Sequence, residues 1–265
     1  MRPPTIPDLK RMCFINNVKM YQAFFTVTLC LTCFQCTVPQ KDAEWIINKA
    51  IETHGGDNYQ NLDLEFDFRD IHYTVYTNNG QFEYTRTFQD SSSLIKDVYN
   101  NSGFNRFRDG KIIEVIKEQA VKYQSSVNSV VYFFLLPYKL DDPAVNAELI
   151  GETVIDGNPY YEVKITFNRE GGGKDFDDIF TYWIHRGKYS MDYLGYLFHV
   201  DGGGTRFRKA FNQRKSGGIL ISDYINYKGP QNLTDIPALD SLYKNGQLEK
   251  LSLIEIENLV VNTID

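Results

Sequence analysis

The segment Ile150–Val200 limits the possible folds most narrowly, because apolar and polar residues alternate along it. In Tyr160–Phe167 the odd-numbered positions are apolar or aromatic and most even-numbered positions are polar, the period-two pattern of a β-strand with one buried face. Glycine lies beside polar residues in Asp156–Asn158 and Arg186–Lys188, as in tight turns. The segment therefore predicts three consecutive antiparallel strands that carry Tyr, Phe and Trp rather than a catalytic motif.

Two helices are predicted before this segment. Asp42–Thr53 begins with a residue that can cap a helix and contains an apolar stripe, and His54 follows it as a cation at the helix C-terminus. Apolar residues return to helical spacing in Gln119–Pro137, where the proline ends the pattern. This second helix is expected to pack across the sheet.

The region between the two helices predicts a β-meander. From Leu62 to Val75 the hydrophobic alternation slips by one residue at Arg69-Asp70, which predicts a β-bulge that bends one long strand. Asn78-Asn79-Gly80 predicts a turn into the next strand. Further strands are predicted at Phe82–Phe88, Leu94–Tyr99, Gly103–Arg108 and Lys111–Ile116.

The residues after Val200 continue the sheet. They predict strands at Arg206–Asn212 and Ile219–Tyr227, a short helix at Asp235–Lys244, and one final apolar strand at Leu248–Val261. The sequence contains no internal repeat and no linker rich in Pro, Gly or Ser. We therefore expect residues 37–265 to form a single domain that follows a leader, residues 1–36.

The leader contains all four cysteines of the chain, Cys13, Cys30, Cys33 and Cys36. Met20–Gln40 has no charged residue and follows basic residues, and its apolar centre has the length of a secretory signal. Cys36 ends this apolar stretch, so it is the expected lipid anchor, as in bacterial lipoproteins. Simple cleavage of the leader and an uncleaved membrane anchor are the alternatives.

The charge of the chain limits its partners. The formal net charge is −6 at pH 7, which gives no reason to expect nucleic acid as a partner, because phosphate binding needs a basic surface. Aromatic residues make up 14% of the sequence, which suits both a sheet-rich protein and an apolar cavity.

Two stretches carry a resemblance to a known superfamily. Gly151–Tyr161 followed by Phe180–Ile184 resembles paired strands of the lipoprotein-carrier (LolA/LolB-like) proteins. Asn128–Pro137 and Asp201–Arg208 resemble an uncharacterised family of secreted lipoproteins. The resemblance implies an α+β, mostly antiparallel fold, a curved incomplete β-barrel (half-barrel) with an N-terminal helix and a covering helix around an apolar cavity. It also implies a periplasmic or outer-membrane lipoprotein of a Gram-negative bacterium, whose partners are a lipid or hydrophobic small molecule, the membrane, and an unidentified protein receptor.

Six residues are candidates for lining the cavity or binding its ligand: Tyr84, Arg86, Phe88, Trp183, His199 and Arg206. Arg86 shares a strand face with aromatic residues, so its burial requires a carboxylate partner or an anionic ligand. Trp183 is expected either in the core or in the cavity wall. His199 is expected either as a core histidine or as a base.

Recognisable catalytic, metal and cofactor motifs are missing from the sequence. The four histidines do not have zinc-ligand spacing, and the glycine runs Gly171–Gly173 and Gly202–Gly204 do not match a phosphate-binding loop. No catalytic residue, metal or cofactor is therefore predicted.

The sequence thus predicts an exported, lipid-anchored, non-enzymatic protein that binds a lipid or other apolar molecule. Two alternatives remain open. One is a secreted hydrolase of an ester or glycan, in which His199, Asp201, Glu83 and Asp223 would converge in one cleft. The other is a structural or interaction lipoprotein whose cavity is filled by its own side chains.

Overall fold

Antiparallel strands make up most of the described part of the computed structural model, residues 41–173, 176–199 and 202–263. They form two seven-stranded sheets. The predicted leader, residues 1–36 with Cys36, lies outside the described residues. Sheet A has the order β14-β1-β2-β3-β4-β5-β6 and sheet B the order β13-β12-β11-β10-β9-β8-β7.

The strands of sheet A are β1 (Asn61–Phe68), β2 (Ile71–Asn78), β3 (Gln81–Asp90), β4 (Ser93–Asn100), β5 (Gly103–Arg108), β6 (Lys111–Ile113) and β14 (Glu257–Thr263). Those of sheet B are β7 (Val145–Ile155), β8 (Asn158–Phe167), β9 (Ile179–His185), β10 (Met191–Phe198), β11 (Gly204–Ser216), β12 (Ile219–Lys228) and β13 (Glu249–Ile254). The helices are α2 (Ala43–His54), α3 (Lys117–Phe134) and α4 (Leu239–Lys244), with short 3-10 turns η1 (Gly56–Tyr59), η2 (Tyr138–Asp141) and η4 (Ile236–Ala238).

Helix α2 forms where the sequence predicts it. The Asp42 carboxylate accepts a hydrogen bond from the backbone N–H of Trp45 at 2.8 Å, which satisfies one free donor of the first turn. Ile46 and Ala50 are fully buried and pack against the inner face of sheet B, where Tyr182 of β9 belongs to the same buried cluster. The amphipathic pattern therefore decides which side of the helix faces the sheet.

The predicted β-bulge at Arg69-Asp70 is wrong, because these two residues form the turn of a hairpin. Phe68 pairs with Ile71, and Arg69 has a φ of 57°. In a two-residue hairpin the flanking residues point to the same face, so even-numbered residues of β1 and odd-numbered residues of β2 share the core. A hairpin therefore produces the same one-residue slip as a bulge.

The single strand predicted at the C-terminus is also wrong, because the chain changes sheets there. Strand β13 pairs with β12 of sheet B, whereas β14 pairs with β1 of sheet A. Between them, the N–H of Ile256 donates to Asp223 at 3.0 Å and the guanidinium of Arg214 donates to the Ile256 carbonyl at 2.7 Å. The tail thus joins the two sheets into one curved layer.

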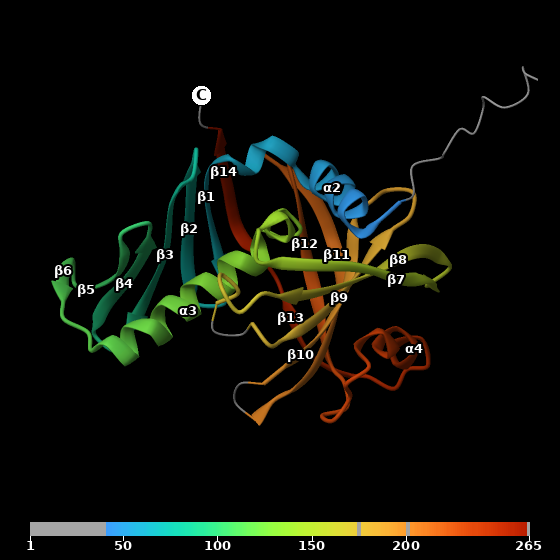
Figure 1. Ribbon diagram of the computed structural model, residues 1–265. Coiled ribbons are helices and arrows are strands. Elements are labelled where there is room, and N and C mark those ends of the chain that lie inside the picture. Colours follow the sequence, from blue (N-terminus) through green and yellow to red (C-terminus); the bar gives the residue numbers. More distant parts are fainter. Residues whose placement is uncertain (1–40, 174–175, 200–201, 264–265) are drawn as a thin grey trace, which may run out of the picture. The chain divides into compact units, whose positions relative to one another are not determined.

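The curved layer stays open, since β6 and β7 end their sheets without pairing with each other in the described part of the chain. Helix α3 runs from the β5–β6 side across the concave side of this layer (Figure 1). Val127 and Val131 of α3 are fully buried against residues of sheet A, such as Phe66. The predicted fold class, a mostly antiparallel open half-barrel with an N-terminal helix and a covering helix, is confirmed.

We expect Asp223→Ala to destabilise the fold at this joint. The side chain of Asp223 is 4% exposed and also pairs with Arg214 at 3.1 Å, so its removal leaves the Ile256 N–H and the Arg214 charge without their partner. The expected loss is about 3 kcal/mol of unfolding free energy, at the lower end for a broken buried pair because Arg214 keeps contact with water.

Urea unfolding followed by circular dichroism measures this loss. Asp90→Ala, at an exposed aspartate of β3, is the control and is expected to stay within about 0.5 kcal/mol of the wild type. Equal effects of the two substitutions would show that the joint depends on other contacts.

Candidate functional site

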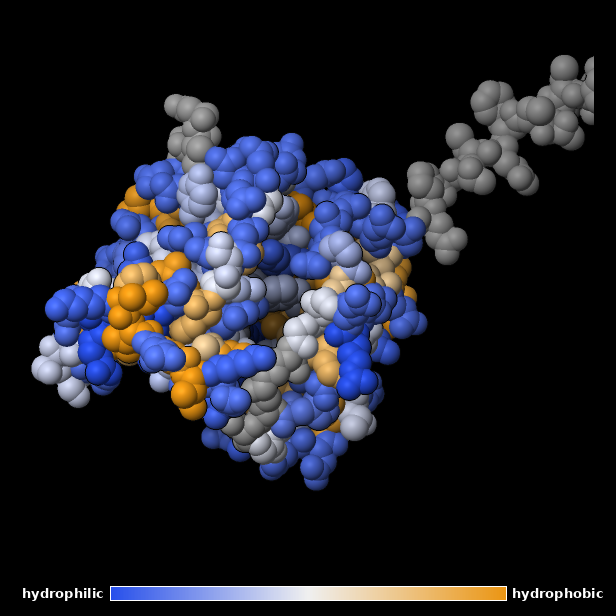
Figure 2. Space-filling model, turned by 60° about the vertical axis from the view of Figure 1, so that its left-hand side comes forward, coloured by the Kyte–Doolittle hydropathy of each residue, from blue (hydrophilic) through white to orange (hydrophobic). Residues whose placement is uncertain are grey.

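A cavity of about 630 Å³ lies along α3, with residues of both sheets in its wall. In Figure 2 a hollow opens near the middle of this face, with hydrophobic side chains beside it. Polar residues such as Asn128, Asp142, Asp178 and Arg208 lie in its wall. Its aromatic and aliphatic lining includes Phe82, Tyr84, Tyr99, Tyr132, Phe133, Leu136, Phe167, Phe180, Leu194 and Tyr196. These residues come from β3, β4, α3 and its C-terminal end, β8, β9 and β10. The curvature of the layer therefore creates a space that the aromatic side chains line without filling.

A second cavity of about 310 Å³ adjoins the first. It is lined by α3 and by the strands at the joint, through residues such as Phe134, Ile221 and Ile254. The two cavities share five lining residues, Ser129, Phe133, Leu136, Tyr196 and Arg208. Both volumes fall in the range of small-molecule sites, about 300–1,000 Å³.

Arg208 of β11 is the cation in the wall shared by the two cavities. It donates a hydrogen bond to the hydroxyl of Tyr196 at 2.9 Å, and its guanidinium carbon lies 4.1 Å from the ring centre of Phe133. Among the described residues no carboxylate forms an ion pair with it, and its buried Nε has no hydrogen-bond partner. Arg208 is thus a half-buried charge held by aromatic rings.

Arg208 lies in a row of residues that crosses sheet B. Leu194 pairs with both Tyr182 and Arg208, and Arg208 pairs with Asn226. The hydroxyl of Tyr182 and Oδ1 of Asn226 are buried and also have no hydrogen-bond partner in the described structure. Burial raises the pKa of Tyr182 well above its usual value, and the charge of Arg208 opposes this rise. Three unsatisfied polar groups therefore share one face of the sheet.

His54 lines the smaller cavity. The expectation that it is a cation at the C-terminus of a helix is wrong. The residue is 2% exposed, and its Nε2 accepts a hydrogen bond from the backbone N–H of Met191 at 3.1 Å. Burial lowers the pKa of His54 to about 4, although the Leu220 backbone opposes this shift. The imidazole is therefore neutral at pH 7, and packing outweighs the attraction of the helix dipole.

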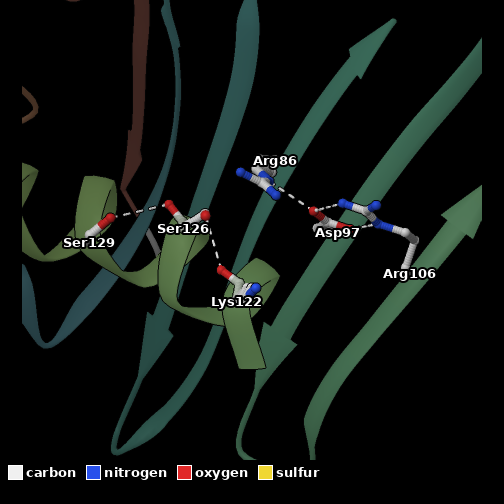
Figure 3. A network of polar contacts seen from close by, with 6 residues as sticks. All are labelled: Arg86, Asp97, Arg106, Lys122, Ser126 and Ser129. Atoms are coloured by element: carbon white, nitrogen blue, oxygen red, sulfur yellow. Dashed lines mark hydrogen bonds and ion pairs between the residues drawn. The ribbon is translucent and has the colours of Figure 1, made fainter. Parts of the chain in front are cut away.

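Arg86 lies on the inner side of sheet A, and its partner is a carboxylate of the protein. Its Nε donates to Asp97 at 2.8 Å, and Arg106 donates to both oxygens of the same carboxylate at 2.6 and 2.8 Å (Figure 3). Asp97 is fully buried, and the ring of Tyr123 from α3 covers Arg106 at 3.2 Å. Of the two partners expected for Arg86, a carboxylate or an anionic ligand, the structure contains the carboxylate.

The other predicted site residues are spread over several places. Tyr84 lines the larger cavity, and the Phe88 ring lies 5.5 Å from the Arg86 guanidinium carbon. Trp183 is fully buried on the opposite side of β9 from Tyr182, where its Nε1 donates to Glu162 at 3.0 Å. Arg206 lies outside the lining of both cavities, with its guanidinium carbon 4.8 Å from the ring centre of Phe198.

His199 lies beside two aspartates at the end of β10. Its Nδ1 is 3.2 Å from Asp178 and 3.7 Å from Asp177. Within the described part of the chain these three residues are the group whose spacing could accept a metal ion, with their ligand atoms inside 4.8 Å. The side chain of His199 is 50% exposed, so a surface hydrogen bond with Asp178 accounts for this arrangement.

The groups considered for a hydrolase do not converge. Glu83 accepts a hydrogen bond from Asn100 on sheet A, whereas Asp223 is held in the joint between the sheets. His199 is engaged with Asp178, and Asp201 lies outside the described residues. The described structure therefore contains no acid–base pair built from these residues.

Sequence reasoning did not identify Arg208 as part of the site. The strand pattern places it on the same face as the apolar Ala210, which is the one available signal. Its lack of a counter-charge is visible only once the neighbouring strands and α3 are in place.

The sequence matches one family over most of its length. Residues 22–257 match a family of unknown function (DUF6503), and the chain belongs to this family. No curated protein matches the sequence.

Two solved structures are similar in fold. A LolA superfamily protein from Nitrosomonas europaea has a TM-score of 0.44 and 12% identity, with 85% of this chain and 96% of that chain covered. A DUF1329 family protein from Desulfovibrio piger ATCC 29098 has a TM-score of 0.41 and 10% identity, with 83% and 93% covered.

The burial of His54 predicts a pH dependence of stability. The pKa of His54 in the folded protein, about 4, lies below the value of about 6.5 in the unfolded chain, so the unfolded chain binds the proton first as pH falls. The contribution of neutral His54 is therefore complete above pH 6.5 and is lost as pH falls towards 4. The loss reaches about 3 kcal/mol, at about 1.4 kcal/mol per pH unit.

Urea unfolding of the wild type and His54→Gln between pH 7 and 4.5 tests this dependence. The variant is expected to show a shallower loss of stability on acidification, because glutamine does not titrate. His72→Gln, at a histidine whose side chain is 42% exposed, serves as the control and should retain the steep loss. Identical pH profiles for His54→Gln and the wild type would refute the assignment.

Proposed function

We propose that the unit Lys41–Asp265 binds an apolar molecule, such as a lipid, in the cavity along α3. The observation that carries this proposal is a cavity of about 630 Å³ with many aromatic and aliphatic side chains in its lining. Small-molecule sites are concave pockets of about 300–1,000 Å³ with apolar side chains in their walls, and this cavity matches them in size and in its aromatic side chains. The alternative of an interior filled by its own side chains loses support for the same reason.

Binding in this cavity is driven by the burial of apolar surface. Each methylene group that leaves water contributes about 0.8 kcal/mol. The rings of Phe133 and Tyr196 contact both cavities, so one elongated molecule can extend from the larger into the smaller one. Helix α3 covers part of this route, and its residue Ser129 stands at the boundary between the two spaces.

The proposal includes export before binding. The uncharged stretch Met20–Gln40 supports a leader, and Cys36 supports a lipid anchor at its end. A periplasmic or outer-membrane location follows from this processing. Among the described residues no helix has the length and hydrophobicity needed to cross a membrane.

Binding is tested by placing a large side chain in the cavity. Ser129→Trp projects an indole from α3 between the two spaces and is expected to weaken binding of the neutral fluorophore N-phenyl-1-naphthylamine by at least about tenfold, or 1.4 kcal/mol. The measurement is a fluorescence titration of the soluble unit. Ser126→Trp is the matched control, because Ser126 is exposed on the same helix, as Ser129 is, but lines neither cavity.

Absence of fluorophore binding by the wild type would overturn the proposed function. Native mass spectrometry of protein purified without detergent adds a direct test, and a co-purified apolar molecule is the expected result. Equal weakening by both tryptophan variants would place the binding outside the cavity.

The anchor is tested separately with Cys36→Ser. Acylation requires the thiol, so this variant is expected to move from the membrane fraction to the soluble fraction of a Gram-negative host and to lose the mass of the acyl groups. Cys33→Ser is the control and should remain in the membrane fraction. Membrane association that survives Cys36→Ser would favour an uncleaved anchor.

A further inference from the structure

We propose that Arg208 binds the acidic head group of the apolar molecule, and that this head group is a carboxylate. This inference rests on the proposed function, because it assigns the chemical class of the ligand in the same cavity. It predicts that long-chain acids bind more tightly than neutral molecules of the same chain length.

The charge of Arg208 is the first support. Arg86 and Arg106 share Asp97, and Arg214 pairs with Asp223, so each of these partly buried arginines has a carboxylate. Arg208 has aromatic rings and one tyrosine hydroxyl instead. A guanidinium in an apolar wall is costly without an opposite charge, and no carboxylate of the described chain supplies one. An anionic ligand would supply this opposite charge.

The unsatisfied donors near Arg208 are the second support. Nε of Arg208 is buried and has no hydrogen-bond partner in the described structure. The same holds for the hydroxyl of Tyr182, which lies on the other side of Leu194 in the same row across the sheet. Tyr182 is fully buried, and its hydroxyl can donate to an oxygen anion. A guanidinium presents its donors in a fixed planar fork that matches the two oxygens of a carboxylate. A carboxylate placed against β11 would thus give the guanidinium of Arg208 the acceptor that it lacks.

The single charge distinguishes a carboxylate from a phosphate. Lys139 is the other cation in the wall of the larger cavity, and burial lowers its pKa while the nearby Asp142 opposes this. Asp142 and Asp178 also lie in this wall, and Arg208 is the cation that lines both cavities. A carboxylate monoanion balances that charge, whereas a phosphate dianion would leave a negative charge buried in aromatic surroundings.

Displacement of N-phenyl-1-naphthylamine by palmitate, hexadecanol and hexadecyl phosphate tests the inference. All three carry the same chain and are used below their aggregation concentrations at pH 8. Palmitate is expected to bind the wild type about 10–100-fold more tightly than hexadecanol, the range for a hydrogen-bonded charge. Hexadecyl phosphate is expected to bind less tightly than palmitate.

Arg208→Gln is expected to remove the preference for palmitate over hexadecanol. Arg206→Gln is the matched control, since it removes the same charge two residues away on β11, outside both cavities, and should keep the preference. Loss of the preference in both variants would show that it reflects overall charge, and would overturn the assignment to Arg208.

The wild-type comparison decides the inference even if Arg208→Gln does not fold. Fluorophore and hexadecanol binding without any preference for palmitate would overturn the carboxylate assignment and leave the proposed function standing. Tighter binding of hexadecyl phosphate would overturn the choice of carboxylate over phosphate. Failure of every probe to bind would overturn the proposed function itself.

Discussion

The buried carboxylate of Asp223 holds the point at which the C-terminal tail passes from one sheet to the other. It accepts the N–H of Ile256 and pairs with Arg214, which in turn donates to the carbonyl of Ile256. This joint makes the two sheets one curved layer, and Ile254 and Ile256 beside it line the smaller cavity. The concave shape on which the site depends is therefore set by a few polar contacts far from either free edge.

The Asp97 cluster fixes the other end of the site. Two guanidiniums meet one buried carboxylate, and the ring of Tyr123 covers Arg106, which attaches the first half of α3 to sheet A. The second half of α3 then extends over the concave side, where Phe133 enters both cavities. The helix is thus anchored by electrostatic contacts at one end and by apolar packing at the other.

Local patterns in the sequence predicted most elements, because capping residues, turn glycines and alternation act over a few residues. The pairing of the strands was harder to predict from the sequence. The slip at Arg69-Asp70 fits a hairpin as well as a bulge, and the apolar tail gives no sign that β13 and β14 belong to different sheets. The site was the hardest part to predict, since the charge of Arg86 is balanced by Asp97 on a neighbouring strand while that of Arg208 has no carboxylate partner in the described structure.

The contrast between Arg86 and Arg208 has a physical consequence for reversible binding. A carboxylate of the protein, such as Asp97, pairs with an arginine permanently, so an anionic ligand gains less by binding there. Aromatic rings stabilise a guanidinium by about 0.5–2 kcal/mol, which is enough to lessen its cost but not to saturate its donors. The ring of Phe133 stabilises the guanidinium of Arg208 in the apolar wall, while its Nε still has a hydrogen bond to donate to an anion. Because the protein compensates the charge of Arg208 only in part, an acidic ligand can both bind there and dissociate.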